Sequence, residues 1–174
     1  MISSTWSLSS LTGEWEAGPS LSEGRYDHCT LTYSNMAVVT GGYSGSLTLS
    51  SVEGVSGESV SQLPHLLTAR RSHGCTVTQG GMLVAGGLGQ DGTVLTSVEM
   101  YVSGVWKEVE SLPSPRYNFP MVSINNSPLV LGGINAENVL VLNTGWQIYC
   151  TEGDDLCHGV TRSGHTALDA STFC

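Results

Sequence analysis

Three Gly-Gly pairs, each at the end of an apolar run, recur along this chain at nearly constant intervals. The pairs end at Gly42, Gly87 and Gly133, and their spacings are 45 and 46 residues. An arginine recurs in the same register, followed three residues later by histidine or phenylalanine, at Arg25 and His28, Arg70 and His73, Arg116 and Phe119, and Arg162 and His165. Chance would not keep separate features in one register. The chain therefore consists of repeats of about 45 residues, a period typical of solenoids and propellers.

Each repeat has the composition of four short strands. In the second repeat these are HGCTV, MLVAGG, SVEMYV and VWKEV, which are rich in β-branched and aromatic residues and bounded by turn-forming residues. No segment has sustained helical periodicity, and the prolines between residues 64 and 128 disfavour helices. One four-stranded sheet cannot bury both of its faces, whereas radially stacked sheets can. The sequence therefore predicts an all-β fold of stacked four-stranded sheets.

The Gly-Gly pairs have a predicted structural role. Glycine adopts positive φ angles and lets the backbone approach other groups closely. We therefore expect the chain to turn sharply at each pair, beneath a side chain of a neighbouring sheet. Trp15 and Trp106 each lie ten residues before a repeat arginine. We expect these tryptophans to pack over the glycine surface and join one sheet to the next.

In these features the chain resembles the kelch-repeat family, over nearly its whole length from Trp15 to about His165. The resemblance rests on the Gly-Gly pairs, on Tyr101 and on Trp15, Trp106 and Trp146. The segment SVEMYVSGVWKEVESLPSPR is very similar to the second half of a family repeat. WD40 repeats have a similar length, but no Trp-Asp dipeptide closes a repeat here. The resemblance implies a kelch-type β-propeller, here a partial one with about three full four-stranded blades plus pieces of a fourth.

The repeats suggest a single domain. It covers residues 1–174, with repeats at about 25–69, 70–115 and 116–161 and partial blades at 1–24 and 162–174. Kelch propellers usually close with more blades than this, so the resemblance implies a fragment of a larger propeller. The alternatives are a small strained ring sealed by the two chain ends and an assembly of several chains. In the last case, self-association would complete the propeller.

The chain departs from the family pattern at several positions. Val60 stands where tryptophan is expected, ten residues before Arg70, and Phe119 stands at a histidine position. Trp146 lies 16 rather than ten residues before Arg162, which indicates a six-residue insertion.

Cys150 and Cys157 bracket this insertion, which has the sequence TEGDDL. The two cysteines either form a disulfide that closes the loop or remain free thiols, and the sequence leaves both alternatives open. There are five cysteines but no C-x-x-C motif, so zinc and thioredoxin-type sites have no support. The cysteines slightly favour an extracellular over a cytoplasmic location.

Charge and hydropathy limit the classes of partner. The net charge is −9 with only six lysines and arginines, so nucleic acids and anionic membranes would be repelled. The longest apolar runs are far shorter than the roughly 20 residues that cross a bilayer. We expect no nucleic-acid partner and no membrane insertion.

The motifs that carry chemistry are weak in this sequence. Residues 87–92 match the dinucleotide pattern G-x-G-x-x-G, but the strand-like segment TVLTSVEMY follows where a helix is required. No G-x-S-x-G elbow occurs, and His28 and His73 recur with the repeat, which indicates a structural role. For the acidic stretch at 154–158, a solvated loop is favoured over a metal site. We therefore expect no catalytic residues, no cofactor and no metal.

The loops at one end of the sheets are the predicted binding site. The loop that enters the first strand and the loop that leaves the second lie at the same end of an antiparallel sheet. Residues after each repeat arginine should therefore gather with residues after each Gly-Gly pair. These positions differ between repeats, and tyrosine and arginine are favoured interface anchors. The predicted partner-binding residues are Tyr26, Asp27, Tyr43, Arg71, Gln90, Asp91, Tyr117, Asn118 and Asn135.

The resemblance implies a function for this end of the sheets. In the kelch family it commonly binds a partner protein, so we expect a non-catalytic module for a protein or peptide. The alternative is a fragment of a secreted kelch enzyme that is carbohydrate-active or oxidase-like.

Overall fold

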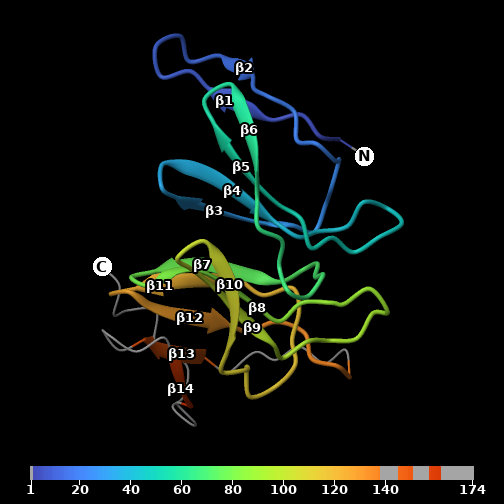
Figure 1. Ribbon diagram of the computed structural model, residues 1–174, viewed down its shortest axis with the longest axis vertical. Helices are drawn as coiled ribbons and strands as arrows, with labels where there is room; N and C mark the ends of the chain where they lie inside the picture. The colour runs from blue at the N-terminus through green and yellow to red at the C-terminus, as the bar shows by residue number, and fades with distance from the viewer. Residues whose placement is uncertain (1, 138–144, 151–156, 162–174) are drawn as a thin grey trace.

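The computed structural model describes residues 2–137, 145–150 and 157–161 (Figure 1). These residues form strands and no helix, and therefore include no helix that could cross a membrane. A two-stranded sheet contains β1 (Trp6–Leu8) and β2 (Trp15–Ala17). Sheet 1 contains β3 (Cys29–Tyr33), β4 (Met36–Thr40), β5 (Val52–Ser56) and β6 (Ser59–Leu63). Sheet 2 contains β7 (Gly74–Thr78), β8 (Gly81–Ala85), β9 (Val98–Val102) and β10 (Val105–Val109). Sheet 3 contains β11 (Met121–Ile124), β12 (Ser127–Leu131), β13 (Gly145–Cys150) and β14 (Cys157–Thr161).

Each four-stranded sheet is an antiparallel meander in which the strands follow chain order. The first strands of successive sheets meet, because β3 contacts β7 and β7 contacts β11. The sheets are therefore stacked along the chain, one for each repeat (Figure 1). The prediction of an all-β fold with four short strands per repeat is confirmed.

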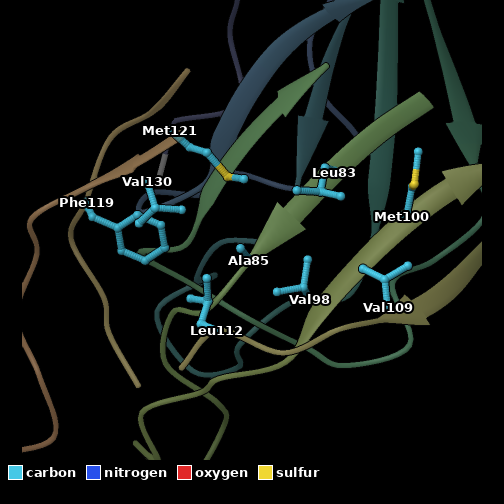
Figure 2. Close-up of a cluster of buried hydrophobic side chains, with 9 residues drawn as sticks. All are labelled: Leu83, Ala85, Val98, Met100, Val109, Leu112, Phe119, Met121 and Val130. Carbon is cyan, nitrogen blue, oxygen red and sulfur yellow. The ribbon is translucent and has the colours of Figure 1, made fainter. Parts of the chain in front are cut away.

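The core lies between neighbouring sheets. One buried cluster joins sheets 1 and 2, and it includes Val38, Met82 and Val84. A second cluster joins sheets 2 and 3, and it includes Leu83 and Ala85 (Figure 2). Successive side chains of β8 therefore enter different clusters, as the alternation of a strand requires. This burial on both faces explains why the segment MLVA is apolar without a break.

The Gly-Gly pairs have the predicted backbone role. In sheet 2, Gly86 and Gly87 have φ angles of +59° and +95°. A Cβ atom on Gly86 would lie 2.6 Å from the carbonyl oxygen of Arg116, and one on Gly87 would lie 2.6 Å from that of Arg71. Only glycine fits such close approaches at positive φ without strain.

The predicted position of the tryptophans over the glycines is wrong. Trp106 is buried between sheets 1 and 2, and its indole Nε1 donates a hydrogen bond of 2.8 Å to the carbonyl of Pro64. The side chains nearest Gly41 and Gly86 are instead His73 and Phe119, each located just before the first strand of the next sheet. The reason is that Trp106 lies on the fourth strand, at the outer edge, whereas each Gly-Gly pair ends a second strand near the next sheet's first strand.

Trp146 is also not the counterpart of Trp106. It lies on β13, a third strand, directly opposite Val130. In sheet 2, Glu99 occupies the equivalent place opposite Val84. Glu99 lies 17 residues before Arg116 and Trp146 lies 16 residues before Arg162, so the spacing is normal for a third strand. The predicted six-residue insertion before the repeat arginine, which rested on comparing Trp146 with Trp106, is therefore wrong.

A disulfide that the sequence did not predict joins Cys29 on β3 to Cys75 on β7. Cys29 lies four residues after its repeat arginine, and Cys75 lies five residues after the next one. A shift of one residue turns a side chain to the opposite face of a strand, so the two cysteines face each other across neighbouring sheets. At the next junction Gly74 and Met121 hold these positions, and a Cβ on Gly74 would lie 3.0 Å from that of Met121.

The predicted pair of Cys150 and Cys157 stays a prediction. The backbone register places the two residues directly opposite each other at the ends of β13 and β14. Their side chains, the acidic stretch at 154–155 and the partial blade at 162–174 lie outside the described residues.

The two-stranded sheet has an exposed apolar face. Leu8 pairs with Trp15 and Trp6 pairs with Ala17, so these four side chains share one face. Trp6, Leu8 and Trp15 are between 57% and 66% exposed. Among the described residues, nothing buries this face as the cores bury the inner faces of the larger sheets.

Candidate interaction face

Loops from all three repeats meet in the predicted way at one end of the sheets. Isolated β-bridges pair the residue after each repeat arginine with the residue after the Gly-Gly pair, and the pairs are Tyr26 with Tyr43, Arg71 with Leu88, and Tyr117 with Ile134. We call the surface formed by these residues and their neighbours in the two loops the loop face. Its scaffold repeats, whereas the chemistry of its side chains differs between repeats.

Buried arginines hold the loop face in place. The Arg70 guanidinium donates hydrogen bonds of 2.8 Å to the carbonyl of Gly86 and 2.6 Å to the Oε1 atom of Glu99. Glu99 also accepts hydrogen bonds from the backbone of Leu67 and Thr68, in the loop that leads to Arg70. Burial lowers the pKa of Arg70, and the charge of Glu99 opposes this shift. The arginine is therefore a framework residue that ties the entering loop to the turn at the Gly-Gly pair.

The same anchor recurs with variation in the other repeats. Arg25 bonds the carbonyl of Gly41 and forms a buried ion pair with Glu53. Arg116 bonds the carbonyl of Gly132 at 2.9 Å and the hydroxyl of Ser114 at 2.8 Å. Sequence reasoning missed the two glutamates, although the tripeptide Ser-Val-Glu recurs at a spacing of 46 residues.

Tyr26, Tyr43 and Arg71 form an aromatic and cationic cluster on the loop face. The two tyrosine rings lie edge to face with centroids 5.5 Å apart. The guanidinium carbon of Arg71 lies 4.4 Å from the centroid of the Tyr43 ring, a cation–π arrangement. Tyr26 remains 47% exposed. Among the described residues Arg71 has no carboxylate within salt-bridge distance, and its buried Nε atom has no hydrogen-bond partner.

Three of the other predicted residues fix loops. The Gln90 side chain accepts a hydrogen bond from the backbone of Thr48 and so links the loops of sheets 2 and 1. Asp91 accepts one of 2.9 Å from the backbone of Thr93, and hydrogen bonding from the Thr93 side chain and then from this backbone amide lowers the pKa of the Asp91 carboxyl. Asn135 accepts one of 3.0 Å from the backbone of Glu137. The structure therefore gives these residues a role in loop conformation.

Asp27, Ser72 and Asn118 occupy the same place in successive repeats. Their φ angles are +55°, +53° and +53°, so all three are left-handed. The backbone amide of Ser72 donates 2.7 Å to the carbonyl of Asp27, and that of Asn118 donates 2.9 Å to the carbonyl of Ser72. A chain of hydrogen bonds thus runs from sheet to sheet just before the first strands.

A pocket of about 300 Å³ opens at this line of residues. We call it the junction pocket, and it is lined by Asp27, His28, Ser72, His73, Asn118, Phe119 and Pro120. Its wall therefore comes from all three repeats. Sequence reasoning placed Asp27 and Asn118 on the face but did not find the pocket, because nothing in the sequence shows that their left-handed backbone brings them together.

His73 is a structural residue of this wall. Its Nε2 atom lies 2.8 Å from the hydroxyl of Thr40 in sheet 1. Burial, and then the charge of Arg70 and the neighbouring His28, lower its pKa to about 3. The ring is therefore neutral at physiological pH, and Phe119 takes the same position over Gly86 in the next repeat. The pKa of His28 is also lowered, first by desolvation and then by the charge of Arg25.

The described residues thus define an all-β protein of repeated four-stranded sheets with a loop face at one end. No family model matches the sequence, and no curated protein matches it. The chain is similar to a solved structure described as "Structure of YjhT", with a TM-score of 0.77 and 15% identity. The match covers 92% of this chain and 52% of that one, so this chain spans about half the length of the structure it matches. The likeness shows the fold alone, and the repeated sheets are consistent with a β-propeller-like fold.

Proposed function

We propose that this chain is part of a kelch-type β-propeller and that it acts as a non-catalytic interaction module. Its partner is a protein or peptide that binds the loop face. The observation that carries this proposal is the cluster of Tyr26, Tyr43 and Arg71, which stands on a framework fixed by buried arginines.

The cluster has the properties of an interface anchor. Tyrosine and arginine are the residues most often responsible for binding energy at interfaces, and a rigid support lowers the entropy lost on binding. Here the bridge between Tyr26 and Tyr43 fixes both backbones, and the stacking over Tyr43 holds Arg71. Because Arg71 has no carboxylate partner among the described residues, a partner can supply one.

The disulfide between Cys29 and Cys75 supports an extracellular location for the module. Disulfides persist in oxidising compartments and are rare in the cytosol. Self-association to complete the propeller stays a prediction, and the exposed apolar face of β1 and β2 offers a surface for it.

The test is a triple substitution on the loop face. A partner captured by cross-linking to the native protein would be identified, and its Kd measured by calorimetry. Replacing Tyr26, Arg71 and Tyr117 by alanine should weaken binding at least about thirtyfold, the effect expected of interface hot spots. The matched control replaces Glu58, Val105 and Ile124, which are exposed residues at the opposite ends of the sheets. Equal affinity of the triple variant and the native protein would show that the loop face is not the binding surface.

A further inference from the structure

The junction pocket has polar side chains at three left-handed backbone positions. A left-handed backbone costs a non-glycine residue of order 1 kcal/mol or more, and asparagine and aspartate tolerate it best. The pocket nonetheless has aspartate, serine and asparagine at its three equivalent left-handed positions, Asp27, Ser72 and Asn118. All three are short and polar, and all three present an oxygen that accepts hydrogen bonds.

These oxygens are not used within the described part of the chain. The hydrogen bonds of Asp27 and Ser72 to the next repeat involve only their backbone carbonyls. The side chains of Asp27, Ser72 and Asn118 form no hydrogen bond to another described residue. Asp27 also forms no ion pair within the described part of the chain. The pocket wall therefore contains three uncommitted acceptors, one from each repeat.

The charge of the pocket is negative at neutral pH. Asp27 is the carboxylate among its lining residues. The lowered pKa values of His28 and His73 keep both imidazoles neutral. Ser72, Asn118, Phe119 and Pro120 carry no charge, and the protein as a whole has a net charge of −9. The nearby Arg25 and Arg70 are each neutralised by an ion pair, with Glu53 and Glu99 respectively. The carboxylate of Asp27 therefore favours a cation over an anion in this pocket.

We propose that the junction pocket binds a primary ammonium group through Asp27, Ser72 and Asn118. An ammonium group has three N–H donors, equal in number to the acceptor side chains that the three repeats contribute to the pocket lining. Asp27 supplies the charge-assisted hydrogen bond, and such bonds are stronger than those between neutral groups. A volume of about 300 Å³ is at the lower end for ligand sites and suits one side chain or one small amine.

The group has two natural sources, a lysine side chain of a partner protein or a free small amine. The lysine source rests on the proposed function, since it requires a partner on the loop face. The free-amine source does not.

The experiment is an NMR titration of the full chain with three probes. They are capped lysine (Nα-acetyl-lysine methylamide), the same compound with its side-chain nitrogen acetylated, and 1,5-diaminopentane. We expect the first and third to shift the amide signals of Ser72 and Asn118 and the neutral second probe to leave them unchanged. Tighter binding of capped lysine than of the diamine indicates a partner's lysine, and the reverse indicates a free amine. Equal binding of the acetylated and unmodified lysine would overturn the proposal.

Two substitutions change the charge of the pocket in opposite directions. Asp27→Asn removes the carboxylate but keeps a residue that tolerates the left-handed backbone, and it should weaken binding about tenfold. Asn118→Asp adds a carboxylate and should strengthen binding by a similar factor, a gain that misfolding cannot produce. Glu58→Gln is the matched control, because this exposed carboxylate lies outside the pocket, at the opposite end of the sheets. The proposal fails if Asp27→Asn binds like the native protein or if Asn118→Asp binds no more tightly.

The probe titration needs no partner, so it separates this inference from the proposed function. Tyr26, Arg71 and Tyr117 do not line the pocket. If their replacement leaves partner binding intact while the probes still bind, only the proposed function is refuted. If partner binding depends on them but no probe binds, only the ammonium site is refuted.

Discussion

Replacing His73 by phenylalanine should change how the stability of this protein depends on pH. The third repeat already has phenylalanine at this position, and Phe119 lies over Gly86 much as His73 lies over Gly41. The substitution therefore keeps the packing and removes an ionisable ring. At pH 7 it should cost about 1 kcal/mol, the usual value of a lost hydrogen bond, here the one to Thr40.

In mild acid the effect of His73→Phe on stability should reverse, so that the variant becomes more stable than the native protein. Burial holds the pKa of His73 at about 3 in the folded protein, against 6.5 in the unfolded chain. Below pH 6.5 the unfolded chain binds a proton that the folded protein does not, so stability falls as the pH falls. Each pH unit costs about 1.4 kcal/mol, and at pH 5 the native protein should have lost about 2 kcal/mol through this residue. The variant avoids this loss and should be about 1 kcal/mol more stable than the native protein at pH 5.

Urea denaturation at pH 7, 6 and 5, monitored by tryptophan fluorescence, measures the free energy of unfolding of the native protein and of the variant at each pH. His65→Phe is the matched control, because it removes a histidine that is exposed in the folded protein, and its pH dependence should parallel that of the native chain. If His73→Phe and the native protein lose stability in parallel between pH 7 and pH 5, the ring is not held neutral by burial and the reasoning is wrong.

Two further predictions concern the contacts that join the repeats. Glu99→Gln should lower the free energy of unfolding by about 3–5 kcal/mol, because it leaves the buried Arg70 without an anion, whereas Glu58→Gln in an exposed turn should have no measurable effect. Equal unfolding midpoints of these two variants in urea would contradict a structural role for the ion pair. Replacing Cys29 and Cys75 by alanine should cost about 4 kcal/mol, since the bond closes a loop with a sequence separation of 46 residues. Thermal unfolding with and without reductant checks this, and a native Tm that reductant does not change would contradict it.

The strands and the Gly-Gly turns could be predicted because both depend on local sequence. The segment MLVAGG contains most of β8 and the turn after it, and VWKEV coincides with β10. Alternating burial in a strand and positive φ at glycine leave a direct signal in composition and spacing. The meeting of the two loops at one end followed from the same antiparallel meander.

Contacts between repeats were harder to predict. The place of Trp106 depends on which strand lies at the outer edge of a sheet and which lies near the next sheet, and the repeat period does not say this. The one-residue offset of Cys29 and Cys75 within the repeat is a sequence pattern that indicates the disulfide. The prediction instead paired Cys150 and Cys157, because these two cysteines are close together in the sequence. The position of Trp146 was misjudged because a tryptophan was taken to mark the fourth strand, whereas here it lies on the third, where sheet 2 has Glu99.

Comparing equivalent positions between repeats distinguishes structural residues from binding residues better than residue type alone does. Arg25, Arg70 and Arg116 are chemically prominent, yet each bonds a carbonyl of its own Gly-Gly pair, so their recurrence reflects packing. The left-handed positions behave differently. Their backbone geometry is nearly constant, with φ between +53° and +55°, while the side chains are carboxylate, hydroxyl and amide. Polar residues also hold left-handed positions in the hairpin turns, for example Asn35 and Asn125, so the angle alone does not mark a binding site. What distinguishes Asp27, Ser72 and Asn118 is that all three line one pocket and that their side chains bind no other described residue, which leaves their oxygens available for a ligand.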